Sequence, residues 1–563
     1  MSSKFLGFST GPQDSLLFDN SRSYFTNVGY VRTSNFSMEL RDIDPQTSAD
    51  LGGTANFVIP KAADLLGPCD LMIEFNKATN TQDIGGTAGW VDTVGYAMIE
   101  KITFSVGSHD VEVLTGDHLN IINELMRSDQ QRYGYNQTLK TGRPLCKAEC
   151  EGGETGATSG TFARYLDADM TTNSRDRIIM NDTDVKDGKK LCVPLGLFFT
   201  QHPSKYFPLG AIAGSNEVRI AVKFRTLNEL LQLQPKLEVE DDGSVEFDTT
   251  LAQVTAPTFG TSVLKSASTK LRCHYIHVTG PEATQLMNRE HVRLMKLFHG
   301  NEVRKVFTVP CSPGGSSKTL DIDLSFLHPV QELVITIRKV SDMGSSTQTN
   351  LKIRDLDTGG ATNPFTAKTK NYFAYHGSGR GDPNPDAWEN TLEFDSTANT
   401  FVGSGCFLKV KDFQLRLNGS TAHLDGQGLD RDYLMNRLMP MLHSNTSTEF
   451  QEVADASMVS GIGTRTNNSA NGAADFKHLA ELFDRKEIYV FPFALNPEGA
   501  NPSGSVNFSK VSHAKLTINV DGLRTAVSDN DTGASDEDFQ VDVYGVHFNW
   551  LAIKDGRALT SFA

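Results

Sequence analysis

The sequence has few cysteines and no long apolar run, and each shortage excludes a class of protein. Its 563 residues include seven cysteines, an odd and scattered set: Cys69, Cys146, Cys150, Cys192, Cys273, Cys311 and Cys406. Such a set favours reduced thiols over a disulfide framework. No run approaches the roughly 18 apolar residues of a spanning helix, and residues 1–19 lack the basic and apolar regions of a secretion signal. We therefore expect folding in a reducing, non-secretory compartment.

Blocks of basic residues are also missing. The formal net charge is −15, and acidic and basic residues are interleaved along the chain. Nucleic-acid binding is driven largely by clustered Lys and Arg that displace counterions from phosphates. We therefore expect no direct nucleic-acid binding, and we interpret the acidity as a contribution to solubility.

Short apolar runs separated by stretches rich in Gly, Ser, Thr and Asn make up most of the sequence. This texture is typical of an all-β protein with long turns. A chain of this length exceeds what one hydrophobic core usually organises, so two domains are expected. Long loops are predicted at residues 140–189, 344–405 and 464–474, where we expect surface projections or subunit contacts.

One sequence unit consists of a strand, a glycine turn, a second strand and a short helix. In residues 100–126, apolar residues alternate with polar ones up to Val106, and the alternation resumes after Gly107-Ser108. From Asp117, a predicted N-cap, the apolar period becomes helical. The same order recurs in residues 408–439, where Asn418-Gly419 supplies the turn, Asp430 or Asp432 the cap, and Pro440 the predicted stop.

Two further pairs of segments follow the same order. Residues 191–224 and 491–520 each read as a strand, a proline-containing polar turn and a second strand, and residues 272–278 and 539–553 each read as a closing strand. The three pairs lie about 270 to 310 residues apart in one order, which indicates an internal duplication. Each half is predicted to form a β-sandwich.

A helix is predicted between the halves. Met287, His291, Leu294 and Phe298 fall at helical spacing, and Gly300 follows as a stop. The predicted division is therefore an N-terminal arm at residues 1–23, a first domain at 24–284, a connecting helix at 285–300 and a second domain at 301–563.

The quoted segments resemble the major capsid proteins of the nucleocytoplasmic large DNA viruses. The resemblance is carried by the N-terminal stretch with Gln13-Asp14, by HPVQELVITIR at residues 328–338, and by FALNPEGANPSGSVNFS at residues 493–509. It covers essentially the whole chain in order. The C-terminal stretch departs from the family pattern by having Phe548 where Tyr is usual and Asp555-Gly556-Arg557 in place of a Gly-rich turn.

This resemblance implies two consecutive eight-stranded jelly rolls with short helices and long loops, and a structural protein rather than an enzyme. It further implies a homotrimer that forms a pseudo-hexameric capsomer of an outer icosahedral shell. The partners implied are other capsomers together with penton and minor or cement capsid proteins. The chain would be made in the host cytoplasm and end in the virion, not inserted in a membrane, with an inner membrane beneath the shell left open.

No catalytic, cofactor-binding or metal-binding residue is assigned. His274 and His277 have an odd spacing on a strand, which directs them to opposite faces. Cys146 and Cys150 have no second pair at zinc-finger spacing. Residues 528–538 are acidic but lack the order of a calcium loop.

Two motifs occur close together at residues 377–382. Gly377, Gly379 and Gly381 form an isolated glycine run, and Arg380-Gly381-Asp382 matches a receptor-binding tripeptide that we attribute to chance.

The alternative function is that of a carbohydrate-binding or glycan-processing β-sandwich, which needs an aromatic platform or a carboxylate pair in a cleft. The only tryptophans, Trp90, Trp388 and Trp550, are far apart in the sequence, which gives that alternative little support.

Overall fold

A computed structural model provides the structure of this chain. It describes residues 34–79, 86–91, 93–126, 139, 178–181, 184–185, 190–235, 237–239, 245–247, 258–259, 262–299, 303–309, 317–340, 372–373, 375, 392–395, 400–403, 407–421, 428–443, 488–499, 501–524 and 537–561.

The first half of the chain forms a sandwich of two antiparallel sheets. One sheet has the order β1 (Phe36–Ile43), β16 (Lys270–Val278), β3 (Leu65–Glu74), β10 (Lys190–Leu195). The other has the order β2 (Thr54–Ile59), β11 (Val218–Phe224), β6 (Ile99–Val106), β7 (His109–Leu114). Alternate residues such as Val218, Ile220 and Val222 are buried between the sheets, as the period of a half-buried strand requires.

The second half repeats this arrangement. One sheet contains β17 (His291–Phe298) and β18 (Val303–Val309) beside β29 (Glu537–Lys554), then β20 (Pro329–Lys339) and β26 (Ile488–Pro492), with β27 (Val506–Asn507) and β30 (Arg557–Thr560) added. The other contains β19 (Lys318–Leu324), β28 (Ala514–Arg524), β23 (Phe407–Leu417) and β24 (Ser420–Thr421), with β25 (Leu429–Asp430) also paired to β23.

The two sandwiches share one topology. If the eight principal strands of each half are numbered along the chain, with β17 and β18 together as the first, both halves have sheets of order 1-8-3-6 and 2-7-4-5. This is the order of a jelly roll, in which two Greek keys wrap around one core. The predicted internal duplication into two jelly rolls is therefore confirmed.

Short helices and small sheets are inserted between the principal strands. The helices are α1 (Val94–Ala97), α2 (Gly116–Met126), α5 (Leu227–Leu230) and α6 (Gly280–Asn288), with 3₁₀ turns η3 (Phe198–Thr200), η4 (Pro203–Lys205), η5 (Leu209–Ala211), η6 (Ser266–Ser268) and η8 (Phe508–Lys510). The small sheets pair β12 (Leu231–Pro235), β5 (Gly86–Trp90), β8 (Ile178–Asn181) and β9 (Asp184–Val185); β13 (Leu237–Val239) and β14 (Val245–Phe247); β15 (Thr258–Phe259) and β4 (Ala78–Thr79); and β21 (Leu392–Asp395) and β22 (Thr400–Gly403).

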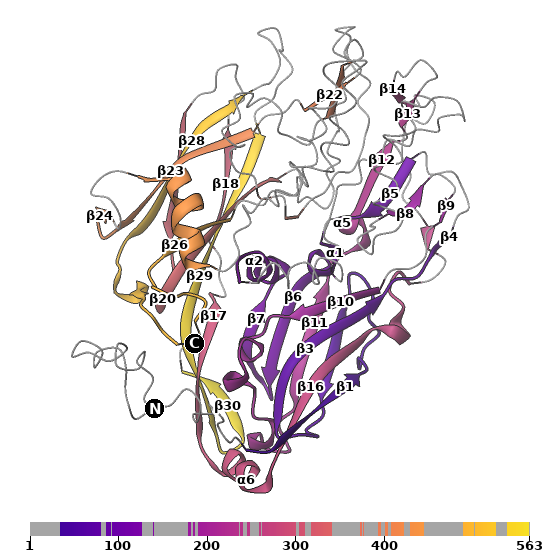
Figure 1. Cartoon of the computed structure of the whole chain (residues 1–563), viewed down its shortest axis with the longest axis vertical. Coiled ribbons are helices and arrows are strands. Elements are labelled where there is room, and N and C mark those ends of the chain that lie inside the picture. Colours follow the sequence, from indigo (N-terminus) through magenta and orange to yellow (C-terminus); the bar gives the residue numbers. More distant parts are fainter. Residues whose placement is uncertain are drawn as a thin grey trace, which may run out of the picture.

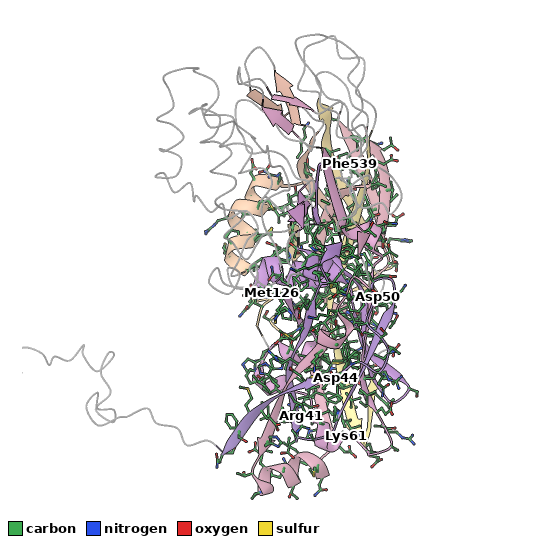
Figure 2. The ribbon with its side chains drawn as sticks, turned by 90° about the vertical axis from the view of Figure 1, so that its right-hand side faces the viewer. Arg41, Asp44, Asp50, Lys61, Met126 and Phe539 are labelled. Atoms are coloured by element: carbon green, nitrogen blue, oxygen red, sulfur yellow. The ribbon has the colours of Figure 1, made fainter. Side chains whose placement is uncertain are left out.

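The two sandwiches are offset along the long axis of the molecule, with the first at the lower right and the second at the upper left of Figure 1. The long strand β29 starts in the second sandwich and runs down beside the first, where β17 and β30 accompany it. In the view turned by 90°, Phe539 at the start of β29 lies toward one end of the molecule and Arg41 and Lys61 of the first sandwich toward the other (Figure 2). Among the described residues, no helix is long and apolar enough to cross a membrane.

The turn predictions between paired strands are confirmed. Gly107-Ser108 joins β6 to β7, and Gly107 has a φ of 63°. Asn418 and Gly419 join β23 to β24 with φ values of 50° and 85°, the two positive values of a type I′ hairpin turn. The predicted long loops at 140–189, 344–405 and 464–474 fall mostly outside the described residues.

The predicted connecting helix over residues 285–300 is wrong in its extent. Helix α6 ends at Asn288, and His291–Phe298 is the strand β17. The apolar residues at helical spacing misled the prediction, because β29 offers eight consecutive partners to this segment, from Ile553 opposite His291 to Val546 opposite Phe298. Pairing along a long neighbouring strand overrides the local period.

Pro440 does not end its helix as predicted. The helix starts as α8 (Arg431–Tyr433), widens into a π-helical segment at Leu434–Leu438 and continues as α9 (Met439–Leu442). A π-helical turn shifts the hydrogen-bond register by one residue, which lets the chain pass a proline that cannot donate. The prediction of Asp430 as the cap is confirmed, since its side chain accepts from the Tyr433 N–H.

Candidate functional site: the joint between the two sandwiches

Helix α2 of the first sandwich is packed against the second sandwich, and its start is held by a close backbone contact. A Cβ atom at Gly116 would lie 2.3 Å from the Tyr96 carbonyl oxygen and 2.7 Å from that of Ile99, so glycine is required there. Asp117, predicted as the N-cap, lies instead in the first turn. The Thr115 hydroxyl accepts from the His118 N–H at 3.4 Å, and this frees the Asp117 carboxylate for another partner.

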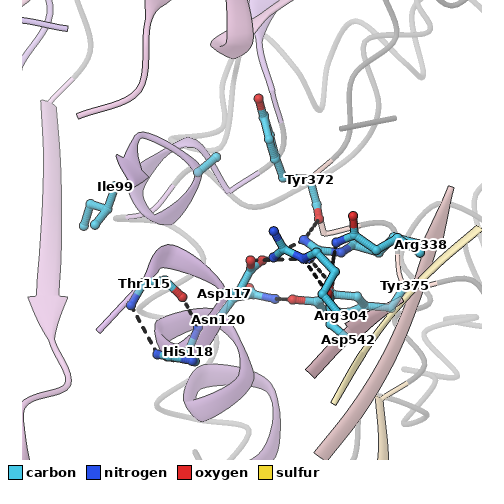
Figure 3. A network of polar contacts seen from close by, with 12 residues as sticks. Ile99, Thr115, Asp117, His118, Asn120, Arg304, Arg338, Tyr372, Tyr375 and Asp542 are labelled. Carbon is cyan, nitrogen blue, oxygen red and sulfur yellow. Dashed lines mark hydrogen bonds and ion pairs between the residues drawn. The ribbon is translucent and has the colours of Figure 1, made fainter. Parts of the chain in front are cut away.

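That partner is Arg338, which lies on β20 of the second sandwich (Figure 3). Its guanidinium donates to Asp117 at 2.8 and 3.4 Å, to the Tyr372 carbonyl at 3.0 Å, and to Asp542 of β29. Asp542 also accepts from Arg304 at 2.7 Å. The joint is therefore a series of alternating charges that starts at Asp117 on α2, continues through the buried Arg338 and Asp542, and ends at the half-exposed Arg304 on β18.

Burial and ion pairing shift the pKa values of Asp117 and Arg338 in opposite directions. Burial, the largest single influence, would raise the pKa of Asp117, but the charges of Arg338 and Arg225 and the hydrogen bonds from Arg338 together hold the pKa below its ordinary value. Burial alone would lower the pKa of Arg338, but Asp117, with Tyr544 and Asp542, raises it well above the ordinary value. Both groups are thus charged at neutral pH, and neither can be removed without leaving the other charge buried.

Aromatic contacts surround the charged chain. The His118 ring stacks on Phe298 with centroids 4.4 Å apart and meets Tyr544 edge-on at 5.3 Å. The Asn120 side chain donates to the Tyr375 hydroxyl at 3.2 Å. Burial lowers the pKa of His118 to about 4, so the ring is neutral when it stacks. Helix α2 therefore contacts the second sandwich through both charged and apolar side chains.

The hairpin between β29 and β30 forms a second contact between the sandwiches. Asp555 and Gly556 have φ values of 51° and 73°, as in a type I′ turn. The Gly556 carbonyl accepts from the Ala213 N–H at 3.0 Å and from the Asn216 side chain at 2.8 Å. The C-terminal hairpin of the second sandwich is thereby fastened to the first.

Replacing Gly556 with Ala tests this contact. The new Cβ would lie 2.4 Å from the Ala213 Cβ and 2.6 Å from its nitrogen, so the hairpin must move. We expect the free energy of unfolding, measured by urea denaturation, to fall by about 2–4 kcal/mol, because left-handed strain of about 1–2 kcal/mol adds to the lost contact.

Gly419→Ala is the matched control, because Gly419 also has a positive φ, of 85°, but open space around its Cβ. Gly419→Ala therefore introduces the backbone strain without the steric contact. Equal losses for the two variants would show that the hairpin contact contributes nothing.

The turn that follows β26 is held by a separate buried network. His443 lies 3.2 Å from a carboxylate oxygen of Glu332 and 3.5 Å from one of Glu498. Burial alone would lower the pKa of His443, but these two carboxylates raise it to about 9, so the ring is charged at neutral pH. Gln331 and Lys296 both donate to the Pro497 carbonyl, Gln331 at 3.0 Å. The wide polar turn is thus fixed to the sheet below it.

Three histidine rings pack together on the other side of the same sheet. His547 on β29 has its ring centroid 5.4 Å from those of His299 and His328. His328 has a φ of 68°, a strained value for a non-glycine residue. Burial, with the two neighbouring rings, lowers the pKa of His547 to about 3. The surroundings of His547 therefore favour its neutral ring.

This cluster predicts a specific loss of stability in acid. The unfolded chain protonates His547 near pH 6.5, whereas the folded chain keeps it neutral down to about pH 3. Below about pH 6 the unfolded state therefore binds one more proton, and stability falls by about 1.4 kcal/mol per pH unit from this residue. His547→Phe should remove that slope in urea denaturation at pH 6, 5 and 4 and fixed protein concentration. The exposed His513 supplies the control His513→Phe, and equal slopes for the two variants would contradict the assignment.

The histidines considered in the sequence for metal binding are paired separately. His277 lies 3.2 Å from Glu39, and His274 lies 3.9 Å from Asp70 on a different strand. In the part of the chain that the structure describes, no three His, Cys, Asp or Glu side chains are placed to hold a metal ion. Of the described cysteines, Cys69, Cys192 and Cys273 form no disulfide.

Several sequence candidates fall outside the described residues. They are Cys146 and Cys150, the glycine run Gly377, Gly379 and Gly381, the tripeptide Arg380-Gly381-Asp382, the acidic residues 528–536, and Trp388. Of the described tryptophans, Trp90 is buried and stacks on Phe75 at 4.2 Å. It is therefore unavailable to a sugar.

The repeated strand order defines a class of protein, the double jelly-roll proteins. The model for "Major capsid protein N-terminus" matches residues 23–256, and that for "Large eukaryotic DNA virus major capsid protein" matches residues 477–558. The two together cover more than half of the chain. The major capsid protein of Phaeocystis pouchetii virus is 24% identical over 97% of this chain and 96% of its own length. That of Paramecium bursaria Chlorella virus 1 is 20% identical over 90% of this chain and 85% of its own.

Solved structures agree on the fold. A chain of the PBCV-1 virus capsid, known from a quasi-atomic model, superposes with a TM-score of 0.57 and 17% identity, covering 96% of this chain and 100% of that one. The Faustovirus major capsid protein superposes with a TM-score of 0.52 and 11% identity, covering 95% and 93%. This chain belongs to the major capsid protein family of the large eukaryotic DNA viruses. Its members are structural proteins and not enzymes, as the sequence resemblance implied.

Proposed function

We propose that three copies of this chain assemble into a pseudo-hexameric capsomer and that these capsomers tile the outer icosahedral shell of a large double-stranded DNA virus. The observation that carries the proposal is the repeated strand order in the two sandwiches. A trimer of double units presents six similar walls, so it fits a hexagonal lattice that three single units would not fill.

The contacts between the two sandwiches support this role. The ion pairs of Arg338, the ring contacts of α2 and the hairpin at Gly556 hold the sandwiches in one orientation. A capsomer wall must keep its angle when neighbours pack against it, and buried charge networks and close packing resist such bending.

The division of the chain belongs to the same proposal. Residues 1–23 form an arm and residues 24–284 the first jelly roll. The connection shortens to residues 285–290, because β17 (His291–Phe298) pairs with β29 and so belongs to the second jelly roll, which spans residues 291–563. Penton and minor or cement capsid proteins are the further partners, and synthesis takes place in the host cytoplasm. The protein binds no nucleic acid directly and is not inserted in a membrane.

Light scattering coupled to size exclusion tests the oligomer. We expect a mass of three 61.6 kDa chains that persists on dilution, because obligate subunit interfaces usually bury more than about 2,000 Å². A chain that stays monomeric at high concentration would contradict the proposal and would reopen the glycan-binding alternative.

A further inference from the structure

An apolar stripe lies exposed on the first strand of the first sandwich. Phe36, Met38 and Leu40 of β1 are 61%, 59% and 54% exposed. Alternate residues of a strand share one face, so the three side chains form one row, here named the β1 stripe. Natural edge strands usually carry charges or proline that prevent association. In the described residues β1 pairs with β16 alone, so the stripe lies at the edge of its sheet.

A second apolar surface lies at the lower end of β29. Val292 is opposite Ala552, Leu294 is opposite Trp550, and Ala552 is opposite Leu559 on β30. Directly opposite residues share a face, so these five side chains form one surface across three strands. Val292, Trp550 and Leu559 are 63%, 42% and 56% exposed. We name these three residues the β29 patch.

The patch continues a sheet face that already binds a first sandwich. On the same strands, further along that face, Phe298 and Tyr544 contact His118 of α2. The face thus starts at the joint within the chain and ends in exposed apolar residues. Contiguous exposed apolar surface of this kind marks a protein interaction site.

The strands that carry the two surfaces lie on opposite sides of the first sandwich in Figure 1, at similar heights. β1 forms the right-hand border of the first sandwich in that view, and β17 and β30 lie to its left. A closed three-fold ring needs two different, complementary surfaces on each copy, whereas a single self-complementary surface gives a dimer. The arrangement therefore fits a second copy of this chain as the occupant of each surface.

We infer that the β1 stripe of one copy binds the β29 patch of the next copy around the trimer. This inference rests on the proposed function, since it names the surfaces through which the proposed trimer closes. The apolar residues supply the centre of the contact, where hot-spot side chains such as Trp concentrate binding energy.

A charge swap in the full chain tests the pairing of the two surfaces. Met38→Lys and Trp550→Glu each place a charge at an apolar contact, and each should raise the concentration at which half the chains are trimeric by about 10- to 100-fold. The variant with both substitutions places a Lys on one surface and a Glu on the other in every contact, and we expect this attraction to recover most of the trimer. Val306→Lys, at a position 51% exposed on β18, is the control and should leave the trimer unchanged.

The outcomes separate this inference from the proposed function. A monomeric wild-type chain overturns both. A wild-type trimer that both single variants retain overturns the inference alone, as does a double variant no better than the single ones. Loss of the trimer on removal of residues 1–33, with the single variants unaffected, assigns the contact to that segment and also overturns it. Circular dichroism checks folding, and Phe36→Lys with Leu559→Glu replaces any variant that fails to fold.

Discussion

Replacing Arg338 with Met is expected to lower the free energy of unfolding by about 3–5 kcal/mol, the largest effect of any single polar substitution in the joint. The change removes the charge that Asp117 and Asp542 share while retaining most of the side-chain volume. Arg304 still pairs with Asp542 at 2.7 Å, so Asp117 is the carboxylate that loses its ion pair. Urea denaturation at fixed protein concentration measures the loss.

The pH dependence of this variant distinguishes charge from packing. In the wild type the pKa of Asp117 is held below its ordinary value, so its contribution is present above about pH 4 and is lost as the pH falls. Without Arg338, burial dominates and raises that pKa, so the variant should lose more stability as the pH rises from 4 to 7. Arg219→Met, which breaks an exposed pair with Glu217, is the control and should cost less than about 1 kcal/mol. A loss in Arg338→Met no larger than this, or independent of pH, would contradict the account of the joint.

Replacing Phe508 with Ala should lower the free energy of unfolding by about 3–5 kcal/mol. Phe508 is 2% exposed and packs edge-on against Phe326 and at an angle against Phe493, both with centroids 6.0 Å apart. The substitution leaves a cavity beneath the wide turn between β26 and β28. Thermal or urea unfolding monitored by circular dichroism measures the change.

Leu495→Ala in the same turn provides the control, because Leu495 is 87% exposed. It should change stability by less than about 0.5 kcal/mol. Similar small effects for both variants would mean that Phe508 does not anchor the turn.

The strands and their pairing in two halves were predictable because local patterns determine them. The alternation before Gly107 and before Asn418 reflects strands with one buried face, and such patterns are visible in the sequence alone. The wide turn was also predictable in part. Residues 491–520 were read as two strands around a polar turn, and the apolar residues Phe491, Phe508, Leu516 and Ile518 are buried there, whereas Phe493 is only partly buried.

The joint was not predictable from local patterns. Arg338 lies next to the last residue of β20, where a charged residue normally indicates solvent, and its partners lie 221 and 204 positions away. Acidic residues favour the first helical turn, so Asp117 was interpreted as a helix cap. No ion pair was therefore predicted for it. The helix prediction for residues 291–298 failed for the same reason, since these residues form a strand only because they pair with β29, which is distant in the sequence.

Electron microscopy of the purified oligomer tests the central claim most directly. If the two jelly rolls of each chain act as equivalent walls, class averages viewed along the three-fold axis should have a six-lobed outline built from three chains. An outline with three lobes, or an oligomer without a three-fold axis, would contradict the account.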